Sequence, residues 1–282
     1  MTPTPPTLTD RRRSFRQLHE SGCFVIPNPW DIGSARYLHS LGFKALASTS
    51  AGFAWSIGRA DNQISRDQAL AHLHSMVWAT DLPINADFES GFAADASGVA
   101  ESVRLAVEAG VAGLSIEDST GDAAHPLYTL DEAVARLRAA RQAIDRSGGD
   151  TLLVGRAECF LVGRPDIDET ITRLKAYAMA GADCLYAPGL RNREHIVAVV
   201  EAVAPKPVNL LIGWASELTV ADIANLGVRR ISVGGALAGA AWTGFMNAAR
   251  LLADPGTFDG FKPSPGRELN ALFRDQSGGS VG

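Results

Sequence analysis

A repeated junction between helix and strand constrains the fold more than any other feature of this sequence. A helical stretch ending in Leu or Ala is followed by Gly and then by an apolar, strand-like run. Gly suits the left-handed backbone position that closes a helix before the chain turns into a strand. The junction occurs four times, in residues 40–48, 108–115, 179–186 and 225–232. Such units predict a parallel sheet covered by helices.

Further apolar runs complete a regular alternation of strands and helices. They predict eight strands, near residues 24, 45, 84, 113, 152, 184, 208 and 230. Eight alternations over about 250 residues predict a single-domain α/β protein, a (β/α)8 barrel of the TIM type. A doubly wound open sheet is the alternative, but no Gly-x-Gly-x-x-Gly follows the first strand. We expect 1–9 to be a disordered tail, 10–253 the barrel, and 254–282 a C-terminal helical extension and tail.

Charge, cysteine content and hydropathy exclude several classes of protein. The formal net charge of −5 argues against a nucleic-acid-binding surface, which is basic. No apolar run approaches the roughly 20 residues of a membrane span. The three cysteines, an odd number, favour reduced thiols, and the first residues lack the layout of a signal peptide. We therefore expect a cytoplasmic protein without a nucleic-acid or membrane partner.

Acidic side chains end two successive predicted strands. Asp87 and Glu89 follow the third strand, and Glu117 and Asp118 follow the fourth. In a barrel the carboxyl ends of the strands meet at one rim, so these acids are expected to converge. Oxygen ligands gathered in this way suit a hard divalent cation such as Mg²⁺. The alternative is that the acids only cap the helices that follow.

The other strands also end in polar groups. An arginine and a run of backbone amides beside a divalent metal would form a pocket for an anion with carboxylate and carbonyl oxygens. The groups expected at this rim are Asn28, Asp31, Thr49, Ser50, Ala51, Asn85, Arg156, Glu158, Tyr186, Asn209, Gly234 and Gly235.

Several of these segments are also motifs of a known family. The sequence resembles the isocitrate lyase/phosphoenolpyruvate mutase superfamily over residues 24–250. The resemblance is carried by Thr49-Ser50-Ala51-Gly52, Gly58-Arg59-Ala60-Asp61, Asn85-Ala86-Asp87, Ser115-Ile116-Glu117-Asp118 and Gly155-Arg156-Ala157-Glu158.

The resemblance implies Mg²⁺-dependent chemistry, with Mn²⁺ as a substitute, that makes or breaks a C–C or P–C bond beside an oxo acid. Asp87 would bind the metal, and Glu117 would bind it directly or through water. Arg156 and the amides of Ser50 and Ala51 would hold the substrate carboxylate, with Thr49 and Asn209 nearby. Homodimers or homotetramers that exchange a C-terminal helix are also implied.

Two departures from the family pattern refine this expectation. Asn85 stands where the family's metal motif has its first Asp, so one negative charge is missing unless Glu89 supplies it. Residues 119–125 replace the lyases' Lys-Lys/Arg-Cys-Gly-His loop, so no cysteine there can donate a proton. A true isocitrate lyase is not expected, and the longer loop of the phosphoenolpyruvate mutases is not matched either.

The resulting prediction is an Mg²⁺-dependent lyase or decarboxylase that cleaves a C–C bond in a small 2-oxo or 2-hydroxy acid through a metal-stabilised enolate. Asp61, Glu89, Glu158, Tyr186 and, less favoured, His125 are candidate acids or bases by position. Two alternatives stay open: a barrel that binds an oxo acid with little catalysis, and a P–C mutase or hydrolase. A Schiff-base aldolase is excluded because none of the four lysines ends a strand.

Overall fold

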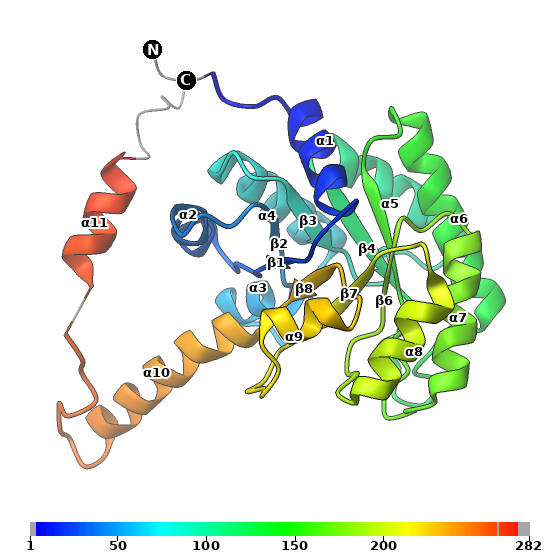
Figure 1. Ribbon diagram of the computed structural model, residues 1–282. Helices are drawn as coiled ribbons and strands as arrows, with labels where there is room; N and C mark the ends of the chain where they lie inside the picture. The colour runs from blue at the N-terminus through cyan, green and yellow to red at the C-terminus, as the bar shows by residue number, and fades with distance from the viewer. Residues whose placement is uncertain (1–3, 264, 276–282) are drawn as a thin grey trace.

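Eight parallel strands form the centre of the protein, as the repeat predicts. The computed structural model describes residues 4–263 and 265–275. Figure 1 shows the strands surrounded by the helices that connect them. The strands are β1 Phe24–Ile26, β2 Leu46–Ala47, β3 Ile84–Asp87, β4 Gly113–Glu117, β5 Leu152–Arg156, β6 Cys184–Tyr186, β7 Val208–Leu211 and β8 Arg230–Ser232.

The sheet curls into a nearly closed barrel. Its strand order is β1-β8-β7-β6-β5-β4-β3-β2, so the first and last strands in the chain are neighbours. β1 pairs with β8 in a parallel register that joins Phe24 to Arg230 and Ile26 to Ser232. Between β1 and β2 the Ala47 amide donates to the Pro27 carbonyl over 3.0 Å, and the Asn28 side chain donates to the Ser48 carbonyl over 2.9 Å. The (β/α)8 prediction is confirmed.

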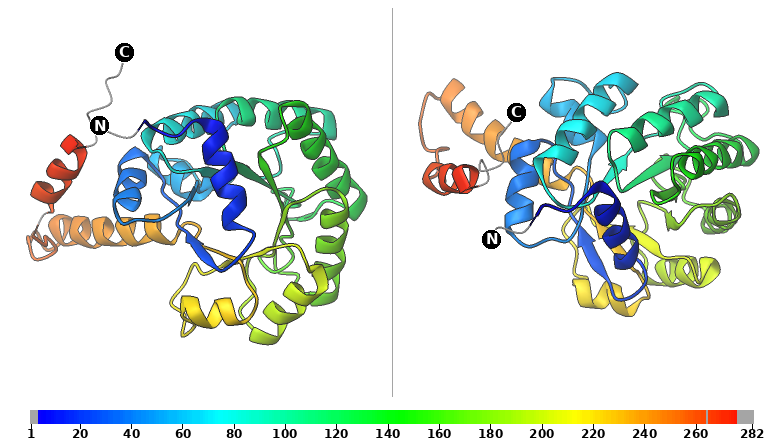
Figure 2. Two further views of the ribbon diagram at one scale, coloured as in Figure 1. Left: turned by 45° about the horizontal axis from the view of Figure 1, so that its top comes forward. Right: turned by 90° about the horizontal axis from the view of Figure 1, so that it is seen from above.

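Helices follow the strands and cover the outside of the barrel, and α10 and α11 extend away from it (Figure 2). Between β2 and β3 there are two helices, α3 and α4. The helices are α1 Leu8–Leu18, α2 Ile32–Ser40, α3 Ser50–Ser56, α4 Arg66–Ala79, α5 Ala96–Glu108, α6 Leu130–Arg146, α7 Ile167–Met179, α8 Arg193–Val203, α9 Val220–Asn225, α10 Ala236–Ala253 and α11 Gly266–Asp275.

The first helix begins at Leu8, inside the segment expected to be a tail. The Thr7 side chain accepts a hydrogen bond from the Asp10 amide, and the Asp10 carboxylate accepts one from the Thr7 amide. This capping box satisfies two free backbone groups and fixes the helix start. Residues 1–3 of the expected N-terminal tail and 276–282 of the expected C-terminal tail lie outside the described residues.

The strand side chains alternate between the helix layer and the barrel interior. On β3, Ile84 and Ala86 belong to the main hydrophobic core beneath the helices, whereas Asn85 and Asp87 line the interior cavity. This period-two pattern brings polar side chains into the barrel without removing apolar packing outside it. Among the described helices, none combines the length and hydropathy that crossing a lipid bilayer requires.

Candidate active site

A cavity of about 180 Å³ opens at the carboxyl ends of the strands. Its walls come from all eight strands or from the loops after them, so residues distant in the sequence meet there. Six of the predicted rim positions after β1, β2 and β8 line it, together with predicted residues from β3, β5 and β6. The lining residues discussed below are Ser50, Ala51, Asp61, Asn85, Asp87, Arg156, Tyr186, Arg230 and Ser232.

Arg156, the last residue of β5, connects the acids of this region. Its Nη1 atom lies 3.0 Å from Oδ1 of Asp87 and 3.3 Å from Oε2 of Glu117. Its Nε atom donates a hydrogen bond to Glu158. The register of the sheet causes this convergence, because Glu117 of β4 is paired directly with Arg156 of β5. Acids from neighbouring strands therefore do meet at one place, as predicted.

The cation between Asp87 and Glu117 is a guanidinium in this structure. The sequence suggested that these two acids share a metal ion and that Arg156 holds the substrate. In the structure one arginine nitrogen contacts both carboxylates, so the same side chain lies between the groups expected to bind metal. The Nε and Nη1 atoms of Arg156 make these contacts, and Nη2 does not take part in them.

The second oxygen of Asp87 is held by the loop after β2. Oδ2 accepts hydrogen bonds from the Ser50 amide over 3.0 Å and from the Ser50 hydroxyl over 2.9 Å. The Ser48 hydroxyl accepts a bond from the Asp87 amide over 2.9 Å. Thr49 caps α3, since its side chain accepts from the Gly52 amide. This segment therefore orients Asp87 toward Arg156, a contact that its motif did not predict.

Burial and neighbouring negative charges raise the pKa values of the acidic groups around Arg156. Burial raises the pKa values of Glu117 and Glu158 above the ordinary range, although Arg156 opposes the shift. Burial, then the charges of Asp87 and Asp61, raise the pKa of Glu89 to about 8. Burial also raises the pKa of Tyr186 to about 12, so its phenol keeps its proton at neutral pH.

The oxygen donors of this cluster are of the chemical type that a divalent cation binds. Oε1 of Glu89 is buried and has no hydrogen-bond partner. Asp87, Glu117 and Glu158 contact the Arg156 guanidinium, and Glu89 is near enough to interact electrostatically with Asp87 and Arg156. Carboxylate oxygens are the hard donors that Mg²⁺ prefers. In the described chain, no three His, Cys, Asp or Glu side chains are already gathered closely enough to form a metal site.

The remaining predicted residues occupy different depths of the barrel. Tyr186 lies in the cavity, with the Arg156 guanidinium 5.1 Å from its ring centre. Asp61 is at the exposed mouth and Ala51 is in the wall. Asn209 is buried deeper and is not among the cavity-lining residues, because its amide bonds to Ser232 and Arg230. The side chain of His125 is exposed, 3.5 Å from Asp122.

Sequence reasoning missed an anchor behind the site. The buried Asp118 accepts hydrogen bonds from the Glu158 amide over 2.8 Å, from Arg173 over 3.0 Å and from the Tyr177 hydroxyl over 2.6 Å. It therefore fixes the backbone of Glu158 instead of facing the cavity. The two side-chain donors, Arg173 and Tyr177, are on α7. Their spacing of three and four residues from other buried α7 positions was the signal in the sequence that could have placed them on the buried face.

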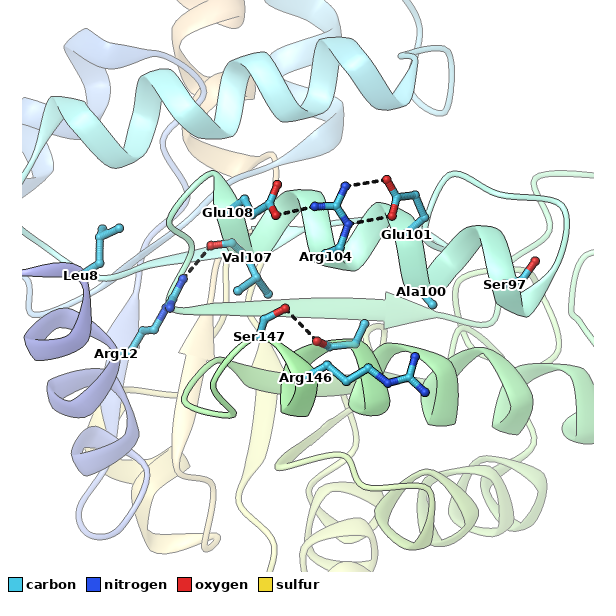
Figure 3. A pocket seen from close by; sticks show the side chains of 11 residues that line it. Leu8, Arg12, Ser97, Ala100, Glu101, Arg104, Val107, Glu108, Arg146 and Ser147 are labelled. Atoms are coloured by element: carbon cyan, nitrogen blue, oxygen red, sulfur yellow. Dashed lines mark hydrogen bonds and ion pairs between the residues drawn. The ribbon is translucent and has the colours of Figure 1, made fainter.

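A larger hollow lies outside the barrel, between α1, α5 and α6 (Figure 3). Its volume is about 690 Å³. The Arg104 guanidinium there is paired with Glu101 and Glu108 on the same helix. These charges are already neutralised and exposed to solvent, so we place the chemistry in the smaller cavity.

Comparisons with known proteins agree with the geometry. Residues 15–253 match the sequence model of the family described as phosphoenolpyruvate phosphomutase. An oxaloacetate decarboxylase from Paraburkholderia xenovorans is 32% identical over 232 residues, covering 79% of this chain and 74% of that protein. A provisionally named lyase/mutase structure from Burkholderia cenocepacia has a TM-score of 0.91 at 47% identity, with 95% of this chain and 98% of that chain covered. The structure of a 2,3-dimethylmalate lyase has a TM-score of 0.84 at 28% identity, with 98% and 97% covered.

Proposed function

The chain belongs to the phosphoenolpyruvate phosphomutase family of the phosphoenolpyruvate mutase/isocitrate lyase superfamily, and from this premise we propose how its cavity works. It is an enzyme, a carbon–carbon lyase of this superfamily. We propose that it is an Mg²⁺-dependent lyase or decarboxylase acting on a small 2-oxo or 2-hydroxy carboxylic acid. Relatives named oxaloacetate decarboxylase and 2,3-dimethylmalate lyase support this substrate class.

The observation that carries the proposal is the position of Arg156. Its Nε and Nη1 atoms are fixed by acids from three strands or the segments after them, and Nη2 is outside those contacts. A guanidinium oriented in this way offers its remaining N–H groups to a substrate carboxylate in a defined direction. Because Arg156 is already held, little conformational entropy would be lost when the substrate binds.

The acids around Arg156 would hold the cation. Asp87, Glu117 and Glu89 are the oxygen donors that fit best, since the Asn85 side chain bonds with neighbouring groups lower in the barrel. A bound Mg²⁺ would supply positive charge beside the reacting oxygens. Ser50 would keep the Asp87 carboxylate oriented through its amide and hydroxyl.

Proton transfer would use a group in the cavity wall. Tyr186 lies beside Arg156 and remains a phenol at neutral pH, so it can donate a hydrogen bond to oxygen on which negative charge develops. Glu158 positions Arg156 through the bond to Nε. Asp61, at the mouth, is an alternative proton carrier. Glu89 could serve in the same way only where Asp87 and Glu117 hold the cation without it.

The C-terminal helices support an oligomeric assembly. α10 projects from the barrel (Figure 1), and its aromatic side chains are exposed, Phe245 to 62% and Trp242 to 36%. Exposed apolar side chains along a projecting helix indicate an interaction surface. We propose that a second copy of the chain covers this face, by the helix exchange that the superfamily resemblance implies.

Turnover tests the proposed function. Purified protein with Mg²⁺ should release pyruvate and CO₂ from oxaloacetate, or cleave 2,3-dimethylmalate, and EDTA should abolish the reaction. Arg156→Ala should lower kcat/KM by orders of magnitude while the circular dichroism spectrum stays that of a folded barrel. Tight oxo-acid binding without turnover of any 2-oxo or 2-hydroxy acid would refute the proposal and favour a binding protein.

A further inference from the structure

Arg230 places a second guanidinium in the cavity, below Arg156. It is the first residue of β8 and only 2% exposed, yet it lines the cavity. Its Nε atom donates to Oδ1 of Asn209 over 2.8 Å. Its Nη1 atom is 3.4 Å from Oδ1 of Asn85 and 3.5 Å from Nε2 of His19. The Nη2 atom makes no hydrogen bond to any residue in the described ranges.

The groups around Arg230 are neutral. Asn85 and Asn209 carry no charge, and His19 is also uncharged. Nδ1 of His19 lies 2.7 Å from the Phe15 carbonyl, and because a carbonyl can only accept, the ring proton is on Nδ1. Nε2 then presents its lone pair to Arg230. Burial, then the Arg230 charge, lower the pKa of His19 to about 3, so the ring is neutral at physiological pH.

Other buried arginines of the described chain are far better paired. Arg173 contacts the carboxylates of Asp118 and Glu169. Arg11 bonds to two backbone carbonyls and to Asp81, over 2.6 to 3.1 Å. Arg136 donates to three backbone carbonyls, over 2.7 to 3.1 Å. Arg230 has one short hydrogen bond, and no carboxylate of the described residues forms an ion pair with it.

A buried cation without an anionic partner is unstable unless something compensates it. Arg230 lacks an anionic partner partly because residue 85 is Asn. An aspartate at that position would put a carboxylate beside Nη1 of Arg230. The cavity is therefore polarised. In the upper part of the cavity, acids surround Arg156. The floor of the cavity contains Arg230 among uncharged asparagine and serine side chains.

We propose that Arg230 is a specificity-determining residue that binds a second carboxylate of the substrate at the cavity floor. The substrate would then be a dicarboxylate, with one carboxylate at Arg156 and the other at the Nη atoms of Arg230. This inference rests on the proposed function for the position of the first carboxylate. It adds the reason why the site selects diacids over monoacids of the same length.

Equilibrium binding tests the inference without requiring turnover. Dissociation constants are measured by calorimetry for oxalate, malonate and succinate, each against the monocarboxylate of equal chain length, namely acetate, propionate and butyrate. Measurements are made in Mg²⁺ and again in EDTA. For the wild-type protein we expect at least one diacid to bind about tenfold or more tighter than its monoacid, as a charge-assisted contact would give.

Arg230→Gln should reduce this ratio toward one and leave monoacid binding unchanged. Arg229→Gln is the matched control, because Arg229 is adjacent on the chain but donates to the Gly22 carbonyl outside the cavity. Asn85→Asp gives an independent variant that is expected to fold, since its new carboxylate would pair with Arg230. In EDTA it should also reduce the ratio.

The outcomes separate this inference from the proposed function. Arg230→Gln or Asn85→Asp protein that is folded and keeps the wild-type ratio overturns the inference even if catalysis persists. Selective diacid binding that depends on Arg230, without turnover, supports the inference and refutes the proposed reaction. If Arg230→Gln fails to fold, a wild-type crystal grown with the best diacid decides the question. A carboxylate within hydrogen-bond distance of Arg230 supports the inference, and one directed to the mouth refutes it.

Discussion

Nη1 of Arg156 and Oδ1 of Asp87 lie 3.0 Å apart although 69 residues separate them in the sequence. Asp87 ends β3 and Arg156 ends β5, so the pair spans the intervening strand β4. Both side chains are largely buried, and removal of either partner would leave an unpaired charge in a low-dielectric site. A change in the charge of either residue should therefore also change the position of the other side chain in the cavity wall.

Asp87→Asn tests the catalytic weight of this pair. The amide keeps the shape but loses the charge that orients Arg156, so kcat/KM should fall by roughly a hundredfold or more, which corresponds to about 3 kcal/mol. Steady-state kinetics measure the effect. Asp67→Asn, at an exposed position of α4, should stay within twofold of wild type. Equal activity in both variants would contradict the assignment.

Ser50→Ala removes one of two hydrogen bonds to Oδ2 of Asp87 and leaves the amide bond in place. A hydrogen bond to a charged group contributes about 1.5 to 3 kcal/mol, so kcat/KM should fall about tenfold or more. The matched control is Ser56→Ala at the other end of α3, where the hydroxyl bonds only to the Phe53 carbonyl. A loss of similar size in the control would show that α3 stability, not Asp87, is responsible.

Tyr177→Phe should destabilise the protein. The variant deletes the 2.6 Å bond to Asp118 and leaves a buried carboxylate with one donor fewer, at a cost of about 1.5 to 3 kcal/mol. Urea unfolding monitored by circular dichroism gives this difference. Tyr37→Phe, on a partly exposed face of α2, should change the free energy of unfolding by less than about 0.5 kcal/mol. Equal stability of the two variants would remove the anchoring role of Asp118.

His72 should make folding sensitive to acid. Burial lowers its pKa from 6.5 to about 4, so between these pH values the unfolded chain binds a proton that the folded chain does not. Stability is then fully present above about pH 6.5 and is lost as the pH falls toward 4. His72→Phe keeps the stacking on Phe53, 3.9 Å between ring centres, and should remove about 1 to 2 kcal/mol of this loss because the site is half-buried.

Thermal unfolding between pH 4 and pH 7 measures the slope for wild type and His72→Phe. His74→Phe is the control, because His74 is exposed on the other side of α4. The wild-type slope should persist in the control. An unchanged slope in His72→Phe would show that other groups govern the acid sensitivity.

Phe245→Lys should weaken assembly through α10. Placing a charge on the apolar face of that helix disfavours its burial against a second chain, so light scattering should give a smaller mass at micromolar concentration. Met179→Lys, at an 85% exposed position that ends α7, should leave the mass unchanged. A monomeric wild-type protein would contradict the proposed exchange.

The barrel could be predicted because its cause is local and repeated. Helix-closing glycines such as Gly110 and Gly181 recur before the strands, and both have the left-handed backbone, with φ of 98° and 104°. The start of the first helix was placed two residues late. Its signal was also local, since Thr7 and Asp10 form a capping box that can be read from their spacing.

The contacts within the site were harder to predict because they depend on register and on side-chain reach. The position of the acids at the carboxyl ends of the predicted strands placed them at one rim. It could not show that Arg156 would lie between Asp87 and Glu117. Likewise, Asn209 was expected at the rim. The register of β7 and β8 pairs it with Arg230, one layer lower, and nothing in either segment alone reveals that partnership.

β1 and β2 are joined by one backbone hydrogen bond, Ala47 to Pro27, and by one side-chain bond, from Asn28 to the Ser48 carbonyl, and this sparse bonding has a mechanical consequence. Every other pair of neighbouring strands is joined by a parallel ladder, so the barrel opens most easily between β1 and β2. Ser48 and Asn28 lie at this junction, and both are in the cavity wall. Breathing of the barrel should therefore concentrate beside the substrate, and the Ala47 amide should exchange its hydrogen with solvent sooner than the amides of β4.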